Sequence, residues 1–148
     1  MFPSATPNNG CQNDGEAYTV CLFPTGSAWE SVPGISHLFE HMMIEELKKR
    51  PGSDVNGLST EDYVILFCGG ITPGKILTGL QNMSVSARSL EARKKSLVEE
   101  ITREREAAAD GFSRFVWRGT AFDQYERNPL GEVEDILAIT PEVMEEFK

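Results

Sequence analysis

Hydrophobic runs bounded by Gly, Pro or Thr-Pro divide the chain into strand-like and helix-like segments. Runs rich in β-branched and aromatic residues predict two strands, at 17–23 and 63–68. Runs of good helix formers predict the helices. The helices are expected at 35–49, 72–83, 86–110, 111–124 and from residue 140 onward. The intervening segments 24–34, 50–57 and 126–135 are rich in turn-forming residues and are predicted to be loops.

The same pattern predicts one domain. Residues 1–16 form a polar lead rich in Pro, Asn, Gly and Asp, which we expect to be loosely ordered. Residues 17–148 contain no internal repeat and no linker, so they are predicted to form a single domain. The first half of the predicted helix 35–49 is apolar over most of its circumference, so this helix is expected to be buried.

Composition narrows the classes of function. Apolar residues make up 40% of the 148 residues, which disfavours disorder. The net charge of −9 disfavours nucleic-acid binding, and no apolar run approaches the roughly 20 residues of a membrane-spanning helix. Neither a secretory signal nor a mitochondrial presequence is expected at the start of the chain. Three scattered cysteines are too few for a disulfide framework, so a reducing, cytoplasmic location is expected.

The two histidines of the chain lie four residues apart, at His37 and His41. On a helix, side chains at this spacing project from the same face about 5–6 Å apart, so both imidazoles can bind one ion. Glu40 lies beside them, which completes the H-x-x-E-H pattern of inverzincin zinc sites. In such a site, the imidazoles bind Zn²⁺ and the nearby carboxylate accepts a proton. Two ordinary polar histidines near a helix surface are the alternative.

A catalytic zinc ion needs a third protein ligand, and no further histidine is available. The predicted helix 86–110 has an apolar stripe, and three of its glutamates, Glu99, Glu100 and Glu104, are compared as ligands. The stripe consists of Leu90, Leu97 and Ile101. Glu99 points about 180° away from it, whereas Glu100 lies about 80° from its centre, at the edge of the buried face. Glu104 lies nearer the stripe, so the helical geometry favours Glu100 or Glu104 over Glu99.

Several segments resemble one family of enzymes. The stretch TGSAWESVPGISHLFEHMM is similar to the metal-site signature of the pitrilysin/insulinase family of zinc peptidases, which includes the mitochondrial processing peptidases. DVNGLSTEDYVILF resembles the family's Asn-Ala-x-Thr-Ser segment and the strand behind it. SLVEEI resembles the segment with the third zinc ligand, and NPLGEVEDILAITPEVMEEF resembles the end of the catalytic domain. The match extends in order from about residue 18 to residue 148.

The resemblance implies a zinc-dependent endopeptidase that cleaves a small peptide or an unfolded protein segment. Its zinc ligands would be His37, His41 and Glu100, and Glu40 would be the general base. The implied fold is α+β: a mixed or antiparallel sheet covered by helices, as in one half of a processing peptidase, shortened at both ends.

The resemblance also implies how the peptide binds. An extended substrate is expected to pair with an edge strand, predicted at Tyr63 to Phe67, so that Tyr63 and Ile65 contact it. Asn56 is expected near the cleavage point, although a turn role beside Gly57 is an equal alternative. A second, related subunit is expected to complete the enzyme as a homo- or hetero-oligomer, because the half that closes over the active site in the family is absent here.

The chain departs from the family at three places. The spacing from His41 to Glu100 is 59 residues, which is shorter than usual. Arg93 occupies the position of a supporting glutamate, a role that could have moved to Glu91. Gly57 replaces the usual alanine.

Two other functions compete with the peptidase. S-ribosylhomocysteine lyases share the H-x-x-E-H helix but take their third ligand from a late cysteine, and no cysteine follows Cys68 in this chain. A non-catalytic subunit that supports an active partner is the other alternative, although such members usually lose one of the four site residues.

Overall fold

A three-stranded antiparallel sheet and a set of helices make up the part of the chain described by this computed structural model, residues 18–106 and 118–148. The strands are β1 (Tyr18–Phe23), β2 (Asp54–Ser59) and β3 (Val64–Gly69), in the order β1-β3-β2. The helices are α1 (Ile35–Lys48), α2 (Pro73–Asn82), α3 (Ala87–Glu106), the 3-10 helix η1 (Asp123–Glu126), α5 (Val133–Ala138) and α6 (Pro141–Phe147). The predicted α+β class is confirmed, with an antiparallel sheet.

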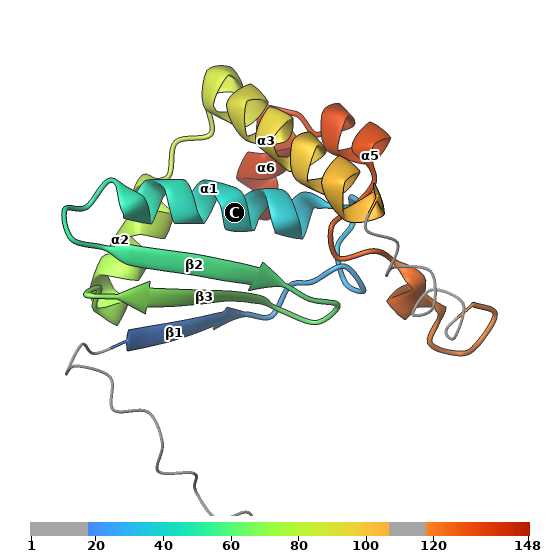
Figure 1. The fold of residues 1–148 in the computed structure, drawn as a ribbon, viewed down its shortest axis with the longest axis horizontal. Helices are drawn as coiled ribbons and strands as arrows, with labels where there is room; N and C mark the ends of the chain where they lie inside the picture. Colours follow the sequence, from blue (N-terminus) through green and yellow to red (C-terminus); the bar gives the residue numbers. More distant parts are fainter. Residues whose placement is uncertain (1–17, 107–117) are drawn as a thin grey trace, which may run out of the picture.

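Helix α1 lies between the sheet and α3, so the described core has helices on one side of the sheet (Figure 1). Side chains alternate along each strand. In β3, Val64, Leu66 and Cys68 are buried against α1, while Ile65 and Phe67 face away. The apolar stripe of α3 (Leu90, Leu97 and Ile101) is fully buried, as predicted. Helix α1 is therefore held from two sides, which fixes the direction of its polar side chains.

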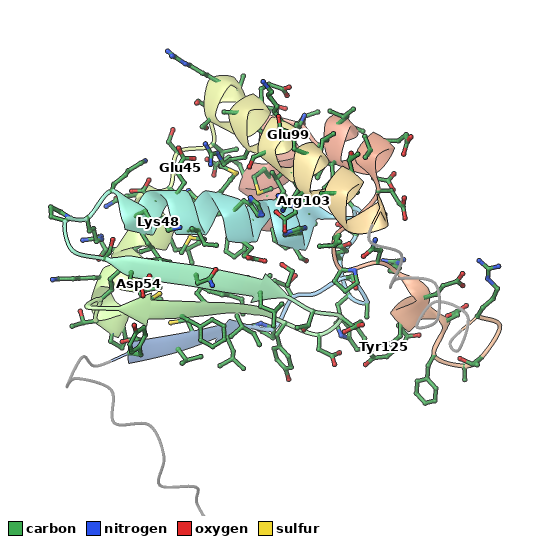
Figure 2. All side chains as sticks on the ribbon, in the orientation of Figure 1. Glu45, Lys48, Asp54, Glu99, Arg103 and Tyr125 are labelled. Carbon is green, nitrogen blue, oxygen red and sulfur yellow. The ribbon has the colours of Figure 1, made fainter. Side chains whose placement is uncertain are left out.

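The opposite face of the sheet is apolar and open within the described residues. Val20 pairs with Phe67, and Leu22 and Leu58 flank Ile65, so these side chains form a continuous surface across the three strands. Apart from Ile65, which is half-buried, each is between 40% and 58% exposed. In Figure 2 the side chains on this face point away from α1 and α3.

Most predicted elements are present, but strand β2 and helix α5 were not predicted. Residues 54–57 were expected to be a turn because Asp, Asn and Gly disfavour strands. Pairing along the whole length of β3 overrides that preference. Of the predicted helix 111–124, residues 111–117 lie outside the described residues. The remainder forms turns and part of η1, and Phe122 is exposed.

The prediction that Tyr63 to Phe67 forms an edge strand is wrong. These residues lead into β3, which pairs with β1 on one side and β2 on the other. No backbone edge of β3 is therefore available to a peptide. The described strands with one unpaired edge are β1 and β2, and β2 is the one beside α1. No helix in the described parts of the chain is long and apolar enough to cross a bilayer.

Candidate metal centre

A buried carboxylate fixes the start of α1. Glu30 accepts hydrogen bonds from the backbone N–H of Gly34 (2.6 Å) and Ser36 (3.0 Å), which are free donors at a helix N-terminus. Gly34 has a φ of +81°, a left-handed conformation that glycine adopts without strain. Glu30 thus works in place of a capping side chain at Gly34 and orients the first turn, which contains His37.

The two imidazoles meet on one face of α1. Their Nε2 atoms are 3.2 Å apart and their ring centroids 4.8 Å apart. His37 is buried, and its Nδ1 lies 3.2 Å from the backbone carbonyl oxygen of Leu130. Because a carbonyl oxygen only accepts, Nδ1 of His37 donates the proton of this hydrogen bond, which leaves Nε2, the nitrogen that lies toward His41, as the atom able to bind an ion. This is the arrangement by which proteins orient a metal-binding histidine.

The carbonyl that contacts His37 is positioned by close packing of two backbones. A Cβ on Gly131 would lie 2.6 Å from the Cα of Gly34, so only glycine allows this approach. The N–H of Leu130 donates to Oδ1 of Asn128 at 3.0 Å, which fixes the preceding turn. The segment after η1 therefore forms part of the wall behind the imidazoles.

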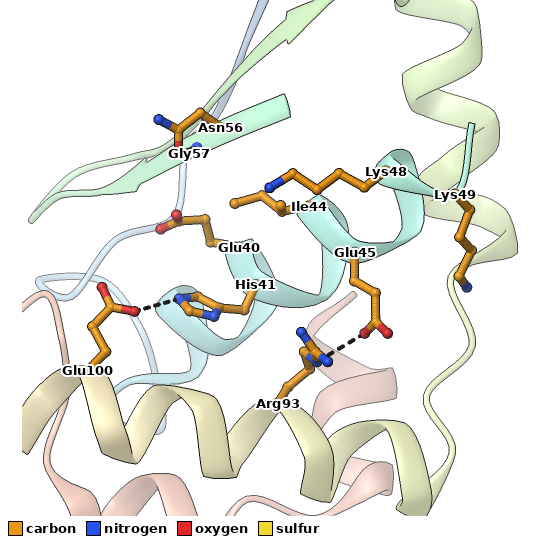
Figure 3. Close-up of a pocket in the computed structure, with 10 residues that line it drawn as sticks. All are labelled: Glu40, His41, Ile44, Glu45, Lys48, Lys49, Asn56, Gly57, Arg93 and Glu100. Atoms are coloured by element: carbon orange, nitrogen blue, oxygen red, sulfur yellow. Dashed lines mark hydrogen bonds and ion pairs between the residues drawn. The ribbon is translucent and has the colours of Figure 1, made fainter. Parts of the chain in front are cut away.

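Glu100 reaches the same point from α3. Its Oε2 is 3.2 Å from Nε2 of His41 (Figure 3). Its Oε1 is 3.7 Å from Nε2 of His37. Zinc bonds of about 2.0–2.2 Å in a tetrahedral site place neighbouring ligand atoms about 3.3–3.6 Å apart. The nearest-atom separations of 3.2, 3.2 and 3.7 Å are close to this spacing, with Oε2 of Glu100 nearer His41 and Oε1 nearer His37. With one ligand atom taken from each residue, the three atoms lie within 4.8 Å of one another. The donor set of two imidazoles and one carboxylate is one that zinc prefers, so these residues fit a zinc ion.

The protonation state of His41 suits a ligand. Burial, followed by repulsion from His37, lowers the pKa of His41 to about 4. His41 is therefore neutral at neutral pH, and an ion can bind it without displacing a proton.

Glu40 lies next to the three converging residues but points to β2. It is 5% exposed, and it accepts a hydrogen bond from the Ser59 hydroxyl at 2.5 Å. A Cβ on Gly57 would lie 2.6 Å from Oε1 of Glu40, so the carboxylate packs directly under the glycine. Burial raises the pKa of Glu40, while the Ser59 hydrogen bond and His37 oppose the rise. A raised pKa brings a carboxylate closer to the working range of a general base.

Arg93 extends the site along α3. Its Nε is 3.1 Å from Oε2 of Glu45 on α1, and its charge contributes to the low pKa of His41. Glu91 does not take the place of the supporting glutamate that Arg93 replaces. It is exposed and pairs with the buried Lys94, which also donates to the carbonyl oxygen of Leu137 in α5. The salt bridge between Arg93 and Glu45 instead joins α3 to α1.

The other predicted site residues are placed as follows. Glu99 is exposed on α3 (Figure 2), as its helical angle predicted. The side chain of Glu104 lies outside the described residues. Asn56 lies on β2 at the rim of a cavity lined by Glu40 and Glu100. Tyr63 and Ile65 are not brought to the site, because Ile65 faces the open side of the sheet and Tyr63 is exposed in the turn before β3.

Two functional contacts were not predicted from the sequence. Ser59 lies in the segment DVNGLSTEDYVILF, and its position three residues after Asn56 gives no sign of its hydrogen bond to Glu40. The Leu130 carbonyl has no signature at all, because every residue has one. Only the Gly131 that follows it marks an unusual backbone position.

Comparison with solved structures finds proteases that share this fold. A protease from Helicobacter pylori superposes over 88% of the chain with a TM-score of 0.66 and 19% identity. The periplasmic protease PqqL from Escherichia coli superposes over 88% with a TM-score of 0.63 and 20% identity. The chain spans 36% of the first protein and 17% of the second. No protein-family model and no curated protein sequence matches the chain.

Proposed function

We propose that this chain is the catalytic part of a zinc-dependent endopeptidase of the pitrilysin/insulinase type. The observation that carries the proposal is the convergence of His37, His41 and Glu100, whose nearest side-chain atoms are 3.2 to 3.7 Å apart. The shared fold with two bacterial proteases supports the same reaction class.

A zinc ion held by His37, His41 and Glu100 would supply a Lewis acid that polarises the scissile carbonyl and lowers the pKa of the attacking water. His37, held by Leu130, and His41, neutral at working pH, keep the three-ligand geometry with Glu100. Glu40 accepts the proton of the water and passes it to the leaving amine. The short hydrogen bond from Ser59 and the contact with Gly57 hold the Glu40 carboxylate in one position between proton transfers.

We propose that the substrate peptide pairs with the free edge of β2. Asn56 and Gly57 line the same cavity as Glu40, His41 and Glu100, so a peptide extended along β2 passes the reaction centre. Backbone pairing gives affinity with little demand on side chains. Asn56 lies at the rim, where its side-chain amide can bind a peptide carbonyl, although its Oδ1 accepts from the N–H of Gly57.

The lyase alternative is disfavoured by the position of the last cysteine. Cys68 is buried in β3, and the described residues that converge into a possible metal site are two histidines and a glutamate. A site with a thiolate as third ligand would need a cysteine at the place that Glu100 occupies.

We further propose that the active enzyme includes a partner chain, either a second copy or a related subunit. Within residues 18–106 and 118–148, β1 and β2 each have one backbone edge without a strand partner, and such edges readily pair with other chains. Light scattering, followed by cleavage assays with and without the partner, tests this proposal; a monomer that cleaves peptides efficiently alone would refute it.

The single-domain boundary at 17–148 and the cytoplasmic location remain predictions.

The test of the proposed function combines metal content with activity. The purified chain is expected to bind about one Zn²⁺, and the His37→Ala and His41→Ala variants are expected to lose it. Glu40→Gln is expected to keep the zinc but to lose about 10²–10⁴-fold in peptide hydrolysis, since Glu40 is not a ligand. Zinc content near zero with excess metal, or full activity of Glu40→Gln, would overturn the proposal.

A further inference from the structure

One cavity contains both the candidate metal centre and a group of basic side chains. It has a volume of about 560 Å³, with Glu40, His41 and Glu100 at one end and Lys48 and Arg93 further along. Strand β2 forms the opposite wall through Asn56 and Gly57 (Figure 3). A peptide that reaches the metal centre along β2 therefore also passes the basic side chains.

Most charged groups of this cavity have a partner. Arg93 pairs with Glu45 at 3.1 Å, Lys49 pairs with Glu46 at 2.5 Å, and Glu100 contacts His41. Lys48 has no oppositely charged partner among the residues that the structure describes. In Figure 3 its side chain extends from the last turn of α1 past Ile44, with the ammonium toward Asn56. It is the cation of this cavity that can take an anionic group from a ligand.

The distance from the metal centre sets which part of a peptide meets Lys48. Lys48 lies eight positions after Glu40 on α1, which corresponds to about 12 Å along the helix axis. Helix α1 and β2 run in opposite directions, so Lys48 lies over the start of β2 (Figure 1). An extended peptide advances about 3.3 Å per residue, and the lysine side chain reaches back toward Asn56. Its ammonium therefore corresponds to a residue about two to four positions from the cleaved bond.

We propose that Lys48 selects peptides with a carboxylate at that position, supplied by an Asp or Glu side chain. The proposal rests on the proposed function, since it assumes that a peptide lies along β2. The acidic charge of the whole chain, −9, repels acidic peptides on average. Lys48 attracts a carboxylate locally despite this overall repulsion. The preference for an acidic side chain is therefore specific for one position of the peptide and does not extend to net negative charge.

The experiment uses the full chain with added zinc, its partner where activity requires one, and a set of peptides with amidated C-termini. Each peptide carries a single Glu or the isosteric Gln at one position on either side of the cleaved bond. The Glu peptide is expected to have a kcat/KM about two- to fivefold higher at the position facing Lys48, mainly through KM. A second set of peptides places a free C-terminal carboxylate at the same distance from the cleaved bond. Comparison of the two sets shows whether Lys48 recognises an acidic side chain or the C-terminus of the peptide.

Variants at two neighbouring lysines test the assignment. Lys48→Met is expected to reduce the Glu/Gln ratio to about one, and Lys48→Glu to favour Lys in the peptide instead. Lys49→Met is the matched control, because Lys49 is paired with Glu46, and it is expected to keep the ratio. A preference that persists in Lys48→Met, a ratio near one in the unmodified chain, or a preference for the free terminus alone overturns the inference.

Failure of the proposed function gives a different result. If no peptide is hydrolysed by the zinc-loaded enzyme, the peptidase assignment fails. The affinities of labelled Glu and Gln peptides, measured by fluorescence anisotropy, then still test Lys48. Tighter binding of the Glu peptide that disappears in Lys48→Met supports the carboxylate subsite, and equal affinities refute it.

Discussion

The contact between Gly57 and Glu40 gives the sharpest prediction about the site. In Gly57→Ala, the new methyl group would lie 2.6 to 2.9 Å from Oε1, Cγ and Cδ of Glu40, against an ordinary contact of about 3.5–4.0 Å. The backbone of Gly57 has no positive φ, so alanine itself causes no strain there. The Glu40 carboxylate therefore has to move by about 1 Å, which breaks its hydrogen bond with Ser59.

The size of the effect follows from two opposing terms. Loss of a hydrogen bond to a charged acceptor lowers the free energy of unfolding by about 1.5–3 kcal/mol. Replacement of glycine by alanine raises it by about 0.4–1 kcal/mol through the unfolded state. We expect Gly57→Ala to be net destabilising by about 1–2 kcal/mol in the unmodified chain, but stabilising by about 0.4–1 kcal/mol in a Glu40→Ala background, where the methyl group has room.

Urea denaturation of the four proteins in this double-mutant cycle measures the coupling directly. Gly74→Ala is the matched control, because a Cβ there meets no atom within 4 Å. A displacement of about 1 Å at a catalytic group costs about 10²-fold in rate, so Gly57→Ala is also expected to lose activity while keeping its zinc. Additive effects of Gly57→Ala and Glu40→Ala would show that the two groups are not in contact.

Three further predictions concern the surrounding residues. Glu100→Gln is expected to lose about 10-fold or more in zinc affinity by metal titration, while Glu99→Gln on the exposed face keeps it; the reverse result would mean that Glu99 is the ligand. Glu30→Gln is expected to lower the free energy of unfolding by about 1.5–3 kcal/mol, because the buried carboxylate holds two N–H groups of α1; an unchanged urea midpoint would contradict this. The pKa of His41 is lowered from 6.5 to about 4 in the folded chain, so between these pH values the unfolded chain binds more protons. The metal-free protein is therefore expected to lose up to about 3 kcal/mol of stability as the pH falls from 6.5 to 4, and His41→Gln is expected to flatten the part of this slope above pH 5.

The sequence predicts the local parts of this site well and the long-range parts poorly. His37, Glu40 and His41 share one helix, so their spacing determines which faces they occupy. The apolar stripe of α3 limits the third ligand to Glu100 or Glu104, and only the resemblance of SLVEEI to the family segment favours Glu100. Strand β2 could not be predicted in this way, because its Asp, Asn and Gly residues favour a turn and its extended form depends on pairing with β3.

The misassigned peptide-binding strand has the same origin. Residues 63–67 have the apolar, β-branched composition of a strand, and composition does not tell an edge strand from a central one. That distinction depends on the order β1-β3-β2, in which the first strand of the chain adds to the far side of β3. The exposed face that Ile65 shares with Phe67 and Leu22 follows from the same order.

The hydrogen bond between His37 and Leu130 has a consequence for the kinetics of folding. It joins residues 93 positions apart, and Glu100 lies 59 positions after His41. Contacts between residues so far apart in the sequence form late in folding. The chain loses entropy when the loop closes, before the contact itself contributes any stabilisation. The two histidines leave the ribosome about 5–20 s before Leu130, at a synthesis rate of about 5–20 residues per second. For the first part of that interval the chain has two histidines without Glu100, and until its end it lacks the Leu130 carbonyl that orients His37. If the proposed zinc site is correct, high-affinity metal binding would depend on these last steps of folding, and metal uptake would report native assembly.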